Sequence, residues 1–209
     1  YNSSDISLDN NICSSNSRLG ILLEYSSNNT LSNNICENNI LGIQLSDSNN
    51  NTLDNNTCSN NDGYGIWLDN SDNNTLDNIT CKNNHYGIHL YYSCNNTLTN
   101  NICKNNDFGI YLEHSGNNFV SKNIVEKNDC GIYLCCLSDN NLISNNNFLN
   151  NASQAYDLRT NCWDNGYPSG GNYWSDYTGE DEDGDGIGDI PYHIPGDNNQ
   201  DRYPLMNPV

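Results

Sequence analysis

The sequence predicts an all-β solenoid, a parallel β-helix of about seven coils of 22–23 residues followed by an irregular C-terminal cap. The first observation is a repeat, because variants of the phrase NNTL recur every 22 or 23 residues. The second is that apolar residues alternate within each repeat, as in strands, between clusters of Asn, Gly and Asp typical of turns. The expected coil starts are Asp5, Asn28, Asn50, Asn73, Asn95, Asn117 and Asn140.

The charge of the chain limits its partners. Its 209 residues include 7 Lys plus Arg and 26 Asp plus Glu, a formal net charge of −19. Nucleic acid and anionic membrane surfaces would repel such a chain, so cations, glycans and further copies of itself are the expected partners. No apolar run approaches the roughly 20 residues of a membrane span, so none is expected. The first residues already resemble a repeat, which predicts a mature or trimmed form of a secreted precursor.

Equal positions of successive coils lie above one another in a solenoid, so core columns follow from the repeat. One aliphatic residue follows each coil start, and an Ile-x-Leu pair follows a glycine that permits a sharp corner. The first column is Leu8, Leu31, Leu53, Leu76, Leu98, Val120 and Ile143. The pairs are Ile43 with Leu45, Ile66 with Leu68, Ile88 with Leu90, Ile110 with Leu112 and Ile132 with Leu134.

A third inward column holds cysteine in five coils and Val125 and Phe148 in the last two. Neighbouring coils are about 4.8 Å apart, within the range a disulfide permits, but five thiols cannot all pair. We therefore favour a buried ladder of free thiols, with disulfides or a column of metal ions as alternatives. The column is Cys13, Cys36, Cys58, Cys81 and Cys103.

Asparagine occupies one position in all seven coils. A side-chain amide stacked in this way can donate a hydrogen bond to one neighbouring coil and accept one from the other. Asparagine also tolerates the left-handed backbone angles of tight turns. The asparagine ladder is predicted to contain Asn16, Asn39, Asn61, Asn84, Asn106, Asn128 and Asn151.

The phrase NNTLDNITCKNNHYGIHL resembles the NosD-like repeats of archaeal and bacterial surface and secreted proteins, and the resemblance covers residues 5 to about 158. It implies a right-handed parallel β-helix over residues 1–158. This scaffold serves lyases, hydrolases, adhesins and structural proteins alike, so the fold alone assigns no function.

Residues 159–209 leave the repeat and gather two of the three tryptophans and all five prolines. An aromatic-rich tail of this kind is expected to cap the open end of the solenoid. Within it, DEDGDGIGD has the spacing of oxygen ligands around Ca²⁺ and resembles the calcium loops of thrombospondin-type or dockerin repeats. The alternative is a solvated acidic loop. The expected ligands are Asp181, Asp183, Asp185, the Ile187 carbonyl and Asp189.

Five further cysteines interrupt the repeat. Thiols at corners or on the outer face of a secreted protein suggest disulfides. Pairing within the chain, such as Cys162 with Cys135 or Cys136, and cross-links between molecules are the two alternatives. The five are Cys94, Cys130, Cys135, Cys136 and Cys162.

The columns yield no convincing catalytic set. No cluster of basic residues emerges, and Asp47 and Asp69 more resemble a solvated edge than a pair of catalytic carboxylates. One outward column is aromatic and consists of Trp67, His89, Tyr111 and Tyr133, beside a second line of Tyr64, Tyr86 and Phe108. Packing against another subunit, contact with sugar rings and stacking among the rings themselves are the alternatives.

The leading hypothesis is a non-enzymatic extracellular structural protein. Stabilised by calcium, it would associate with copies of itself into a surface layer, sheath or fibre, with disulfide cross-links. The alternative is a surface protein that binds or degrades polysaccharide. A third hypothesis, copper handling, follows the family resemblance, but one methionine, Met206, and buried thiols make a poor copper site.

Overall fold

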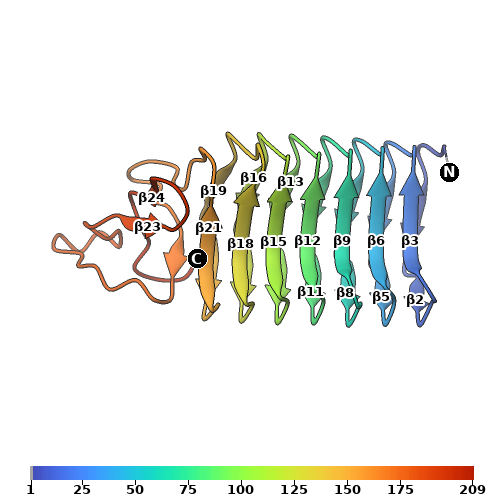
Figure 1. Ribbon diagram of the computed structural model, residues 1–209, viewed down its shortest axis with the longest axis horizontal. Helices are drawn as coiled ribbons and strands as arrows, with labels where there is room; N and C mark the ends of the chain where they lie inside the picture. Colours follow the sequence, from blue (N-terminus) through green and yellow to red (C-terminus); the bar gives the residue numbers. More distant parts are fainter. Residues whose placement is uncertain (1) are drawn as a thin grey trace.

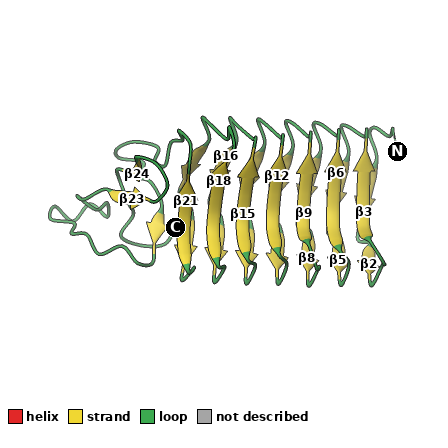
Figure 2. Ribbon diagram, viewed as in Figure 1, coloured by secondary structure: helices red, strands yellow, loops and turns green. Residues whose placement is uncertain are grey.

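Three parallel sheets run the length of a β-helix in the computed structural model, which describes residues 2–209 (Figure 1). Each coil contributes one strand to every sheet, and no helix occurs within the described residues (Figure 2). The predicted fold class is therefore confirmed. The chain accordingly offers no helix, in the part described, that is long and apolar enough to cross a membrane.

The first and second sheets are built from strands of only two or three residues. The first sheet contains β1 (Ser7–Asp9), β4 (Thr30–Ser32), β7 (Thr52–Asp54), β10 (Thr75–Asp77), β13 (Thr97–Thr99), β16 (Phe119–Ser121) and β19 (Leu142–Ser144). The second contains β2 (Ile12–Ser14), β5 (Ile35–Glu37), β8 (Thr57–Ser59), β11 (Thr80–Lys82), β14 (Ile102–Lys104), β17 (Ile124–Glu126), β20 (Asn147–Leu149) and β22 (Tyr173–Trp174).

The third sheet has the longest strands and the broadest outer face. Its strands are β3 (Leu19–Glu24), β6 (Leu41–Ser46), β9 (Tyr64–Asp69), β12 (Tyr86–Tyr91), β15 (Phe108–Glu113), β18 (Cys130–Cys135) and β21 (Ser153–Asp157). The C-terminal segment adds a separate antiparallel pair, β23 (Tyr192–Ile194) and β24 (Asn199–Asp201).

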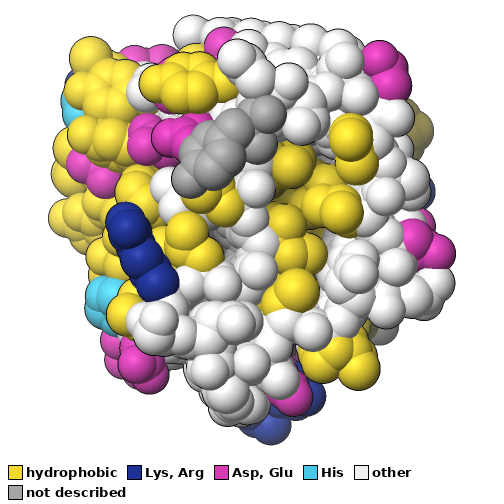
Figure 3. All heavy atoms as spheres, turned by 90° about the vertical axis from the view of Figure 1, so that its right-hand side faces the viewer, with side chains coloured by type: hydrophobic (Ala, Val, Ile, Leu, Met, Phe, Trp, Pro, Cys, Tyr) yellow, Lys and Arg dark blue, Asp and Glu magenta, His cyan; other side chains and the backbone are white. Residues whose placement is uncertain are grey.

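Strand pairing places equal repeat positions opposite one another. Leu76 pairs with Leu98, Cys81 with Cys103 and Ile88 with Ile110 in the three sheets. The aliphatic columns are buried in the middle coils, as the repeat predicts. Figure 3 shows apolar side chains near the centre of the N-terminal end of the helix and along the left edge of the view, with mostly polar atoms around the rest.

The corners explain why asparagine is so abundant. Four residues of most coils adopt left-handed backbone angles, and most of these residues are asparagine, as at Asn70, Asn73, Asn78 and Asn83. Asparagine adopts these angles at less cost than most side chains. The predicted use of asparagine at turns therefore describes the outer corner residues, which lie beside the ladder residues.

Asn16 to Asn151 form the hydrogen-bonded column that the sequence predicts. The Oδ1 atom of Asn106, for example, accepts hydrogen bonds from the backbone and side-chain N–H groups of Asn84 in the preceding coil. Three further ladders, which were not predicted, run along the helix. Two consist mainly of asparagine, for example Asn96 to Asn118 and Asn101 to Asn123, and one consists of serine, for example Ser93 to Ser115.

The C-terminal segment covers one end of the helix, at the left of Figure 1. Its strand β22 pairs with β20 and so extends the second sheet beyond the last coil. Trp163 and Trp174 are buried against Phe148, with ring centroids 6.4 and 4.5 Å from it. The segment therefore seals the apolar interior with aromatic rings.

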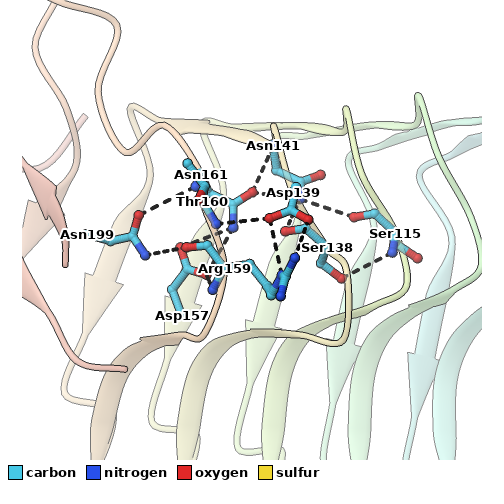
Figure 4. Close-up of polar contacts among 9 residues, drawn as sticks. All are labelled: Ser115, Ser138, Asp139, Asn141, Asp157, Arg159, Thr160, Asn161 and Asn199. Atoms are coloured by element: carbon cyan, nitrogen blue, oxygen red, sulfur yellow. Dashed lines mark hydrogen bonds and ion pairs between the residues drawn. The ribbon is translucent and has the colours of Figure 1, made fainter. Parts of the chain in front are cut away.

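Charged contacts join the last coil to the cap (Figure 4). Arg159 donates two hydrogen bonds to Asp139, at 3.2 and 2.9 Å, in a fork geometry that suits a guanidinium. Asp157 is fully buried and accepts from the Arg159 backbone and the Asn161 amide. Its carboxylate also accepts from the indole of Trp163 at 2.9 Å, so it orients the ring that closes the core.

Asp201 orients the indole ring of Trp174 in the same way that Asp157 orients that of Trp163. It accepts hydrogen bonds from the Trp174 indole, from the backbone of Asn172 and from the backbone of Tyr203. Burial raises the pKa of Asp201 to about 6 from an ordinary value of 3.8. The folded chain therefore binds more protons than the unfolded chain between these two values.

We expect the free energy of unfolding to fall as the pH rises from about 4 to about 6. The raised pKa of Asp201 alone should account for a fall of up to about 3 kcal/mol. Asp201→Asn should remove this contribution, because an amide does not titrate. Denaturant unfolding of the cap, followed by tryptophan fluorescence between pH 4 and 8, measures it. The exposed Asp197→Asn is the control and should keep the wild-type profile. An unchanged profile in Asp201→Asn would contradict the assignment.

Candidate functional site

The most distinctive surface of the helix is the outer face of the third sheet. Strand pairing places Trp67, His89, Tyr111 and Tyr133 in one outward column and Tyr64, Tyr86 and Phe108 in a second. Tyr156 continues the first column and was missed, because its coil lacks the glycine and Ile-Leu pair of the repeat. We call these eight residues the aromatic face.

The rings of the aromatic face stack on one another. Tyr64 and Tyr86 lie 4.9 Å apart between ring centroids, and His89 and Tyr111 lie 4.7 Å apart, with interplanar angles of 13° and 16°. Tyr133 and Tyr156 are also stacked, at 5.4 Å. Self-stacking, one of the three alternatives, is therefore present. Because ring faces are used in these contacts, most rings offer their edges and hydroxyl groups outward.

His89 lies at the centre of this face and is only 5% exposed. Burial lowers the pKa of its imidazole to about 4, so the ring is neutral at neutral pH. Neither ring nitrogen has a hydrogen-bond partner. The nearest charged atom is Oε2 of Glu113, 3.6 Å from Nε2.

The corner beside the aromatic face brings two coils together. Glu113 ends β15 and pairs with Cys135, which ends β18. The next residues, His114 and Cys136, both adopt left-handed backbone angles, and the backbone N–H of His114 donates to the Cys136 carbonyl at 2.9 Å. Glu113, His114 and Cys136 can place one ligand atom each within 4.8 Å of one another. From the sequence, Cys136 is predicted only as a candidate for a disulfide or a cross-link, and its proximity to Glu113 and His114 is not predicted.

The cysteine column lies inside the helix. Cys36, Cys58, Cys81 and Cys103 are fully buried, Cys13 is partly exposed in the first coil, and all ten cysteines, each within the described chain, are free thiols. The pairing of Cys162 with Cys135 or Cys136 is therefore not formed. Burial raises the pKa of the Cys81 thiol, and that of Cys103 to about 12. The buried thiols of the cysteine column are therefore packed in the core and unreactive.

The remaining cysteines differ in exposure. Cys136 and Cys162 are exposed, Cys94 and Cys130 are partly exposed, and Cys135 is buried. The Cys135 thiol lies 3.3 Å from the Tyr111 hydroxyl, and burial raises its pKa to about 12. Only Cys136 and Cys162 are therefore well placed to react with another molecule.

The acidic loop of the cap is closed by hydrogen bonds from its own backbone. Asp181 accepts from the N–H groups of Gly184, Asp185 and Gly186, and Gly186 has a φ of 90° that favours glycine. The carboxylates of Asp181, Asp183 and Asp185 approach within 4.8 Å of one another. Oxygen ligands gathered at this separation fit the coordination preference of Ca²⁺. Ile187 is buried, and Asp189 instead accepts from the Glu182 backbone at 2.7 Å.

Four of the seven basic residues are held in ion pairs. Lys104 and Lys127 pair with Glu126, and Arg159 and Arg202 pair with Asp139 and Asp164. Asp69 lies close enough to Asp47 for their charges to interact, and burial first and then Asp47 raise the Asp69 pKa. Asp47 and Asp69 therefore place two carboxylates close together, and within the described part of the chain neither forms an ion pair with a basic residue.

Comparisons with known proteins identify the family. The family model described as "Periplasmic copper-binding protein (NosD)" matches residues 75–179, half of the chain, and the model "Right handed beta helix region" matches residues 1–107. The chain belongs to the NosD family of right-handed β-helix proteins. A family member of Stutzerimonas stutzeri, "Probable ABC transporter binding protein NosD", is 43% identical over 61 residues. These residues are 29% of this chain and only 14% of that protein.

Two solved structures share the fold. The A-module of the mannuronan C-5 epimerase AlgE6 of Azotobacter vinelandii aligns with a TM-score of 0.66 and 16% identity, over 80% of this chain and 51% of that one. The periplasmic alginate epimerase AlgG aligns with a TM-score of 0.61 and 22% identity, over 77% and 46% of the two chains. At these identities the likeness concerns the fold alone, and this chain spans about half of either protein.

The family description names copper, and the cysteine column does not fit that role. Copper bound by protein thiols requires accessible thiolates, whereas four of the five column thiols are fully buried. Buried thiols with raised pKa values remain protonated at neutral pH. No metal chemistry follows from these residues.

Proposed function

We propose that this chain is a polysaccharide-binding β-helix that acts outside the cytoplasm and holds a glycan chain along its aromatic face. The observation that carries the proposal is the continuous aromatic column from Trp67 to Tyr156 on the third sheet. The periplasmic description of the family and the polysaccharide substrates named for AlgE6 and AlgG agree with it.

The chemistry of the face suits hydrogen bonding to sugars. Ring edges and tyrosine hydroxyls repeat at the spacing of the coils, about 4.8 Å. A glycan chain laid along the face would contact the half-exposed Tyr64 and Tyr86 on successive coils and Tyr133 and Tyr156 further along, with the buried His89 between them. The net charge of −19 favours neutral glycans, and repulsion should weaken acidic ones at low ionic strength.

Binding without cleavage is the favoured activity. Both ring nitrogens of His89 are buried, so this imidazole offers no accessible atom for proton transfer. Lys104, Arg159 and Arg202 are held in ion pairs with Glu126, Asp139 and Asp164. A glycan held on this surface would thus meet acceptors and donors but no positioned base.

The double variant Tyr86→Ala with Tyr133→Ala tests the proposal. We expect about a tenfold loss of affinity for a neutral polysaccharide, because two half-buried rings leave the face. Affinity electrophoresis across a panel of neutral and acidic polysaccharides, followed by calorimetry, measures this. Tyr167→Ala, at an exposed tyrosine of the cap, is the control and should bind normally. Equal binding by the double variant, or no binding of any polysaccharide by the wild type, would refute the proposal.

We also propose that Ca²⁺ occupies the acidic loop and stabilises the cap. Asp181, Asp183 and Asp185 repel one another without a cation between them. Chelation should lower the melting temperature of the cap by several degrees, and added Ca²⁺ should restore it. Asp183→Asn should reduce this dependence, whereas the exposed Asp107→Asn, in a coil, should not. A melting temperature that does not change when Ca²⁺ is removed or added would contradict the assignment.

Self-assembly into a layer, sheath or fibre is a second candidate. The observation that favours it is the pair of exposed thiols, Cys136 in the last coils and Cys162 in the cap, because two reachable thiols per molecule can link one chain to two neighbours. Oxidised protein with Ca²⁺ should then sediment as a polymer that reductant disperses. A Cys162→Ser variant that polymerises equally well would exclude this link.

A further inference from the structure

We infer that Glu113, His114 and Cys136 form a binding site for a thiophilic transition-metal ion of the Zn²⁺ class, independent of the calcium loop. The three residues lie at one corner of two adjacent coils, and their ligand atoms come within 4.8 Å of one another. An imidazole, a thiolate and a carboxylate are the three donor types that zinc accepts together. Alkaline-earth ions, in contrast, prefer oxygen alone.

The backbone brings the donors together. His114 and Cys136 are equivalent corner residues of successive coils, and both adopt left-handed backbone conformations directly after their strands end. A hydrogen bond from the His114 N–H to the Cys136 carbonyl fixes their register. Tyr92 of the preceding coil stacks on the His114 ring at 4.4 Å with an interplanar angle of 6°. The imidazole is therefore positioned before any ion arrives.

Unpartnered nitrogen atoms point to a ligand at this corner. Nδ1 of His114 is buried and has no hydrogen-bond partner. His89, which is 5% exposed, leaves both ring nitrogens without one, and its Nε2 lies 3.6 Å from the Glu113 carboxylate. Buried polar atoms are seldom left unsatisfied. A cation bound by Glu113 and His114, at the zinc–ligand distances of about 2.0–2.3 Å usual for such donors, would satisfy the Nδ1 atom.

Access and charge also favour an ion. Cys136 is exposed and Glu113 and His114 are half-buried, so an ion can reach the corner from solvent. The chain as a whole attracts cations through its net charge of −19. Three protein ligands leave one coordination position open for water or another ligand. This position lies beside the aromatic face, since Glu113 contacts His89.

The test uses the full chain, reduced and stripped of metal by a chelator, then supplied with excess Ca²⁺ so that the acidic loop does not compete. Zn²⁺ is titrated in competition with a chromophoric chelator. We expect one tight equivalent, and a thiolate-to-metal absorption band when Co²⁺ replaces Zn²⁺. His114→Asn and Cys136→Ser should each weaken binding by roughly 100-fold, since loss of a ligand costs at least as much as loss of its supporting contacts.

Two features keep this test decisive. Asn70 occupies the same corner position in an earlier coil with a φ of 46°, so His114→Asn should fold normally, as thermal melting will show. Cys162→Ser removes the other exposed thiol and should bind Zn²⁺ like the wild type. Stoichiometric binding that survives both ligand substitutions, or no binding below micromolar Zn²⁺, would overturn the site. Zn²⁺ binding that is unaffected by Glu113→Gln would overturn the assignment of Glu113 as a ligand.

Discussion

Replacement of Gly87 by alanine should destabilise the β-helix by about 3 to 5 kcal/mol, because the added methyl group meets backbone atoms that cannot move aside. A Cβ atom at this position would lie 2.4 Å from the Gly109 carbonyl oxygen and 3.0 Å from the Asn106 amide nitrogen. The equivalent glycines of the other coils, such as Gly42 and Gly131, meet the same obstacle. Urea unfolding followed by circular dichroism measures the loss.

Gly63→Ala provides a matched control in a neighbouring coil. Its Cβ atom would lie 3.1 Å from the Ile40 carbonyl oxygen and meet only one other atom within 4 Å. We expect a cost of about 1 kcal/mol or less there. If both variants were equally stable, close stacking of the coils at the glycine column would be wrong.

Asn106→Ala should cost about 3 kcal/mol, since it leaves several buried groups without partners. The amide of Asn106 donates to the Cys81 carbonyl at 3.2 Å and to Asn128 Oδ1 at 3.0 Å. Its own Oδ1 accepts from the Asn84 backbone and side chain. Deletion therefore breaks the ladder in both directions, and the denaturation midpoint should fall while the secondary structure at low denaturant is retained.

The neighbouring Asn105 separates the ladder effect from the turn effect. Asn105 is exposed and left-handed, with a φ of 53°, so Asn105→Gly should change stability by less than about 0.5 kcal/mol. Hydrogen exchange offers a second readout for Asn106→Ala, because amide protons of β14 and β15 should lose protection before those of distant coils. Uniform loss along the whole helix would argue against a local ladder.

The repeat made the fold predictable from sequence. Leu98, Cys103 and Ile110 recur at fixed intervals, and a side chain that repeats must meet its own copy in the next coil. The same logic predicted one asparagine ladder. The other ladders were within reach of the sequence, because the second Asn of NNTL recurs in every coil after the first. The Asn two residues before the cysteine column recurs in every coil but one, where Ile79 replaces it.

The candidate sites were harder to predict where they depend on departures from the repeat. Cys136 was recognised as a break in the pattern, but its relation to His114 depends on the corner conformation that aligns the two coils. Ring stacking on the aromatic face depends on side-chain rotamers, which periodicity does not determine. In the cap, the contact between Asp157 and Trp163 joins non-repeating segments that no periodicity relates.

The parallel register of the coils has a consequence for how such a chain can change length. Removal of residues 73–94 would join Asp72 to Asn95, which occupies the same place in its coil as Asn73. Each side chain at the junction would then find the kind of neighbour it had before. Recombination between repeats can therefore lengthen or shorten the rod in whole periods. The same C-terminal segment would still close the end of the helix, whatever the number of coils.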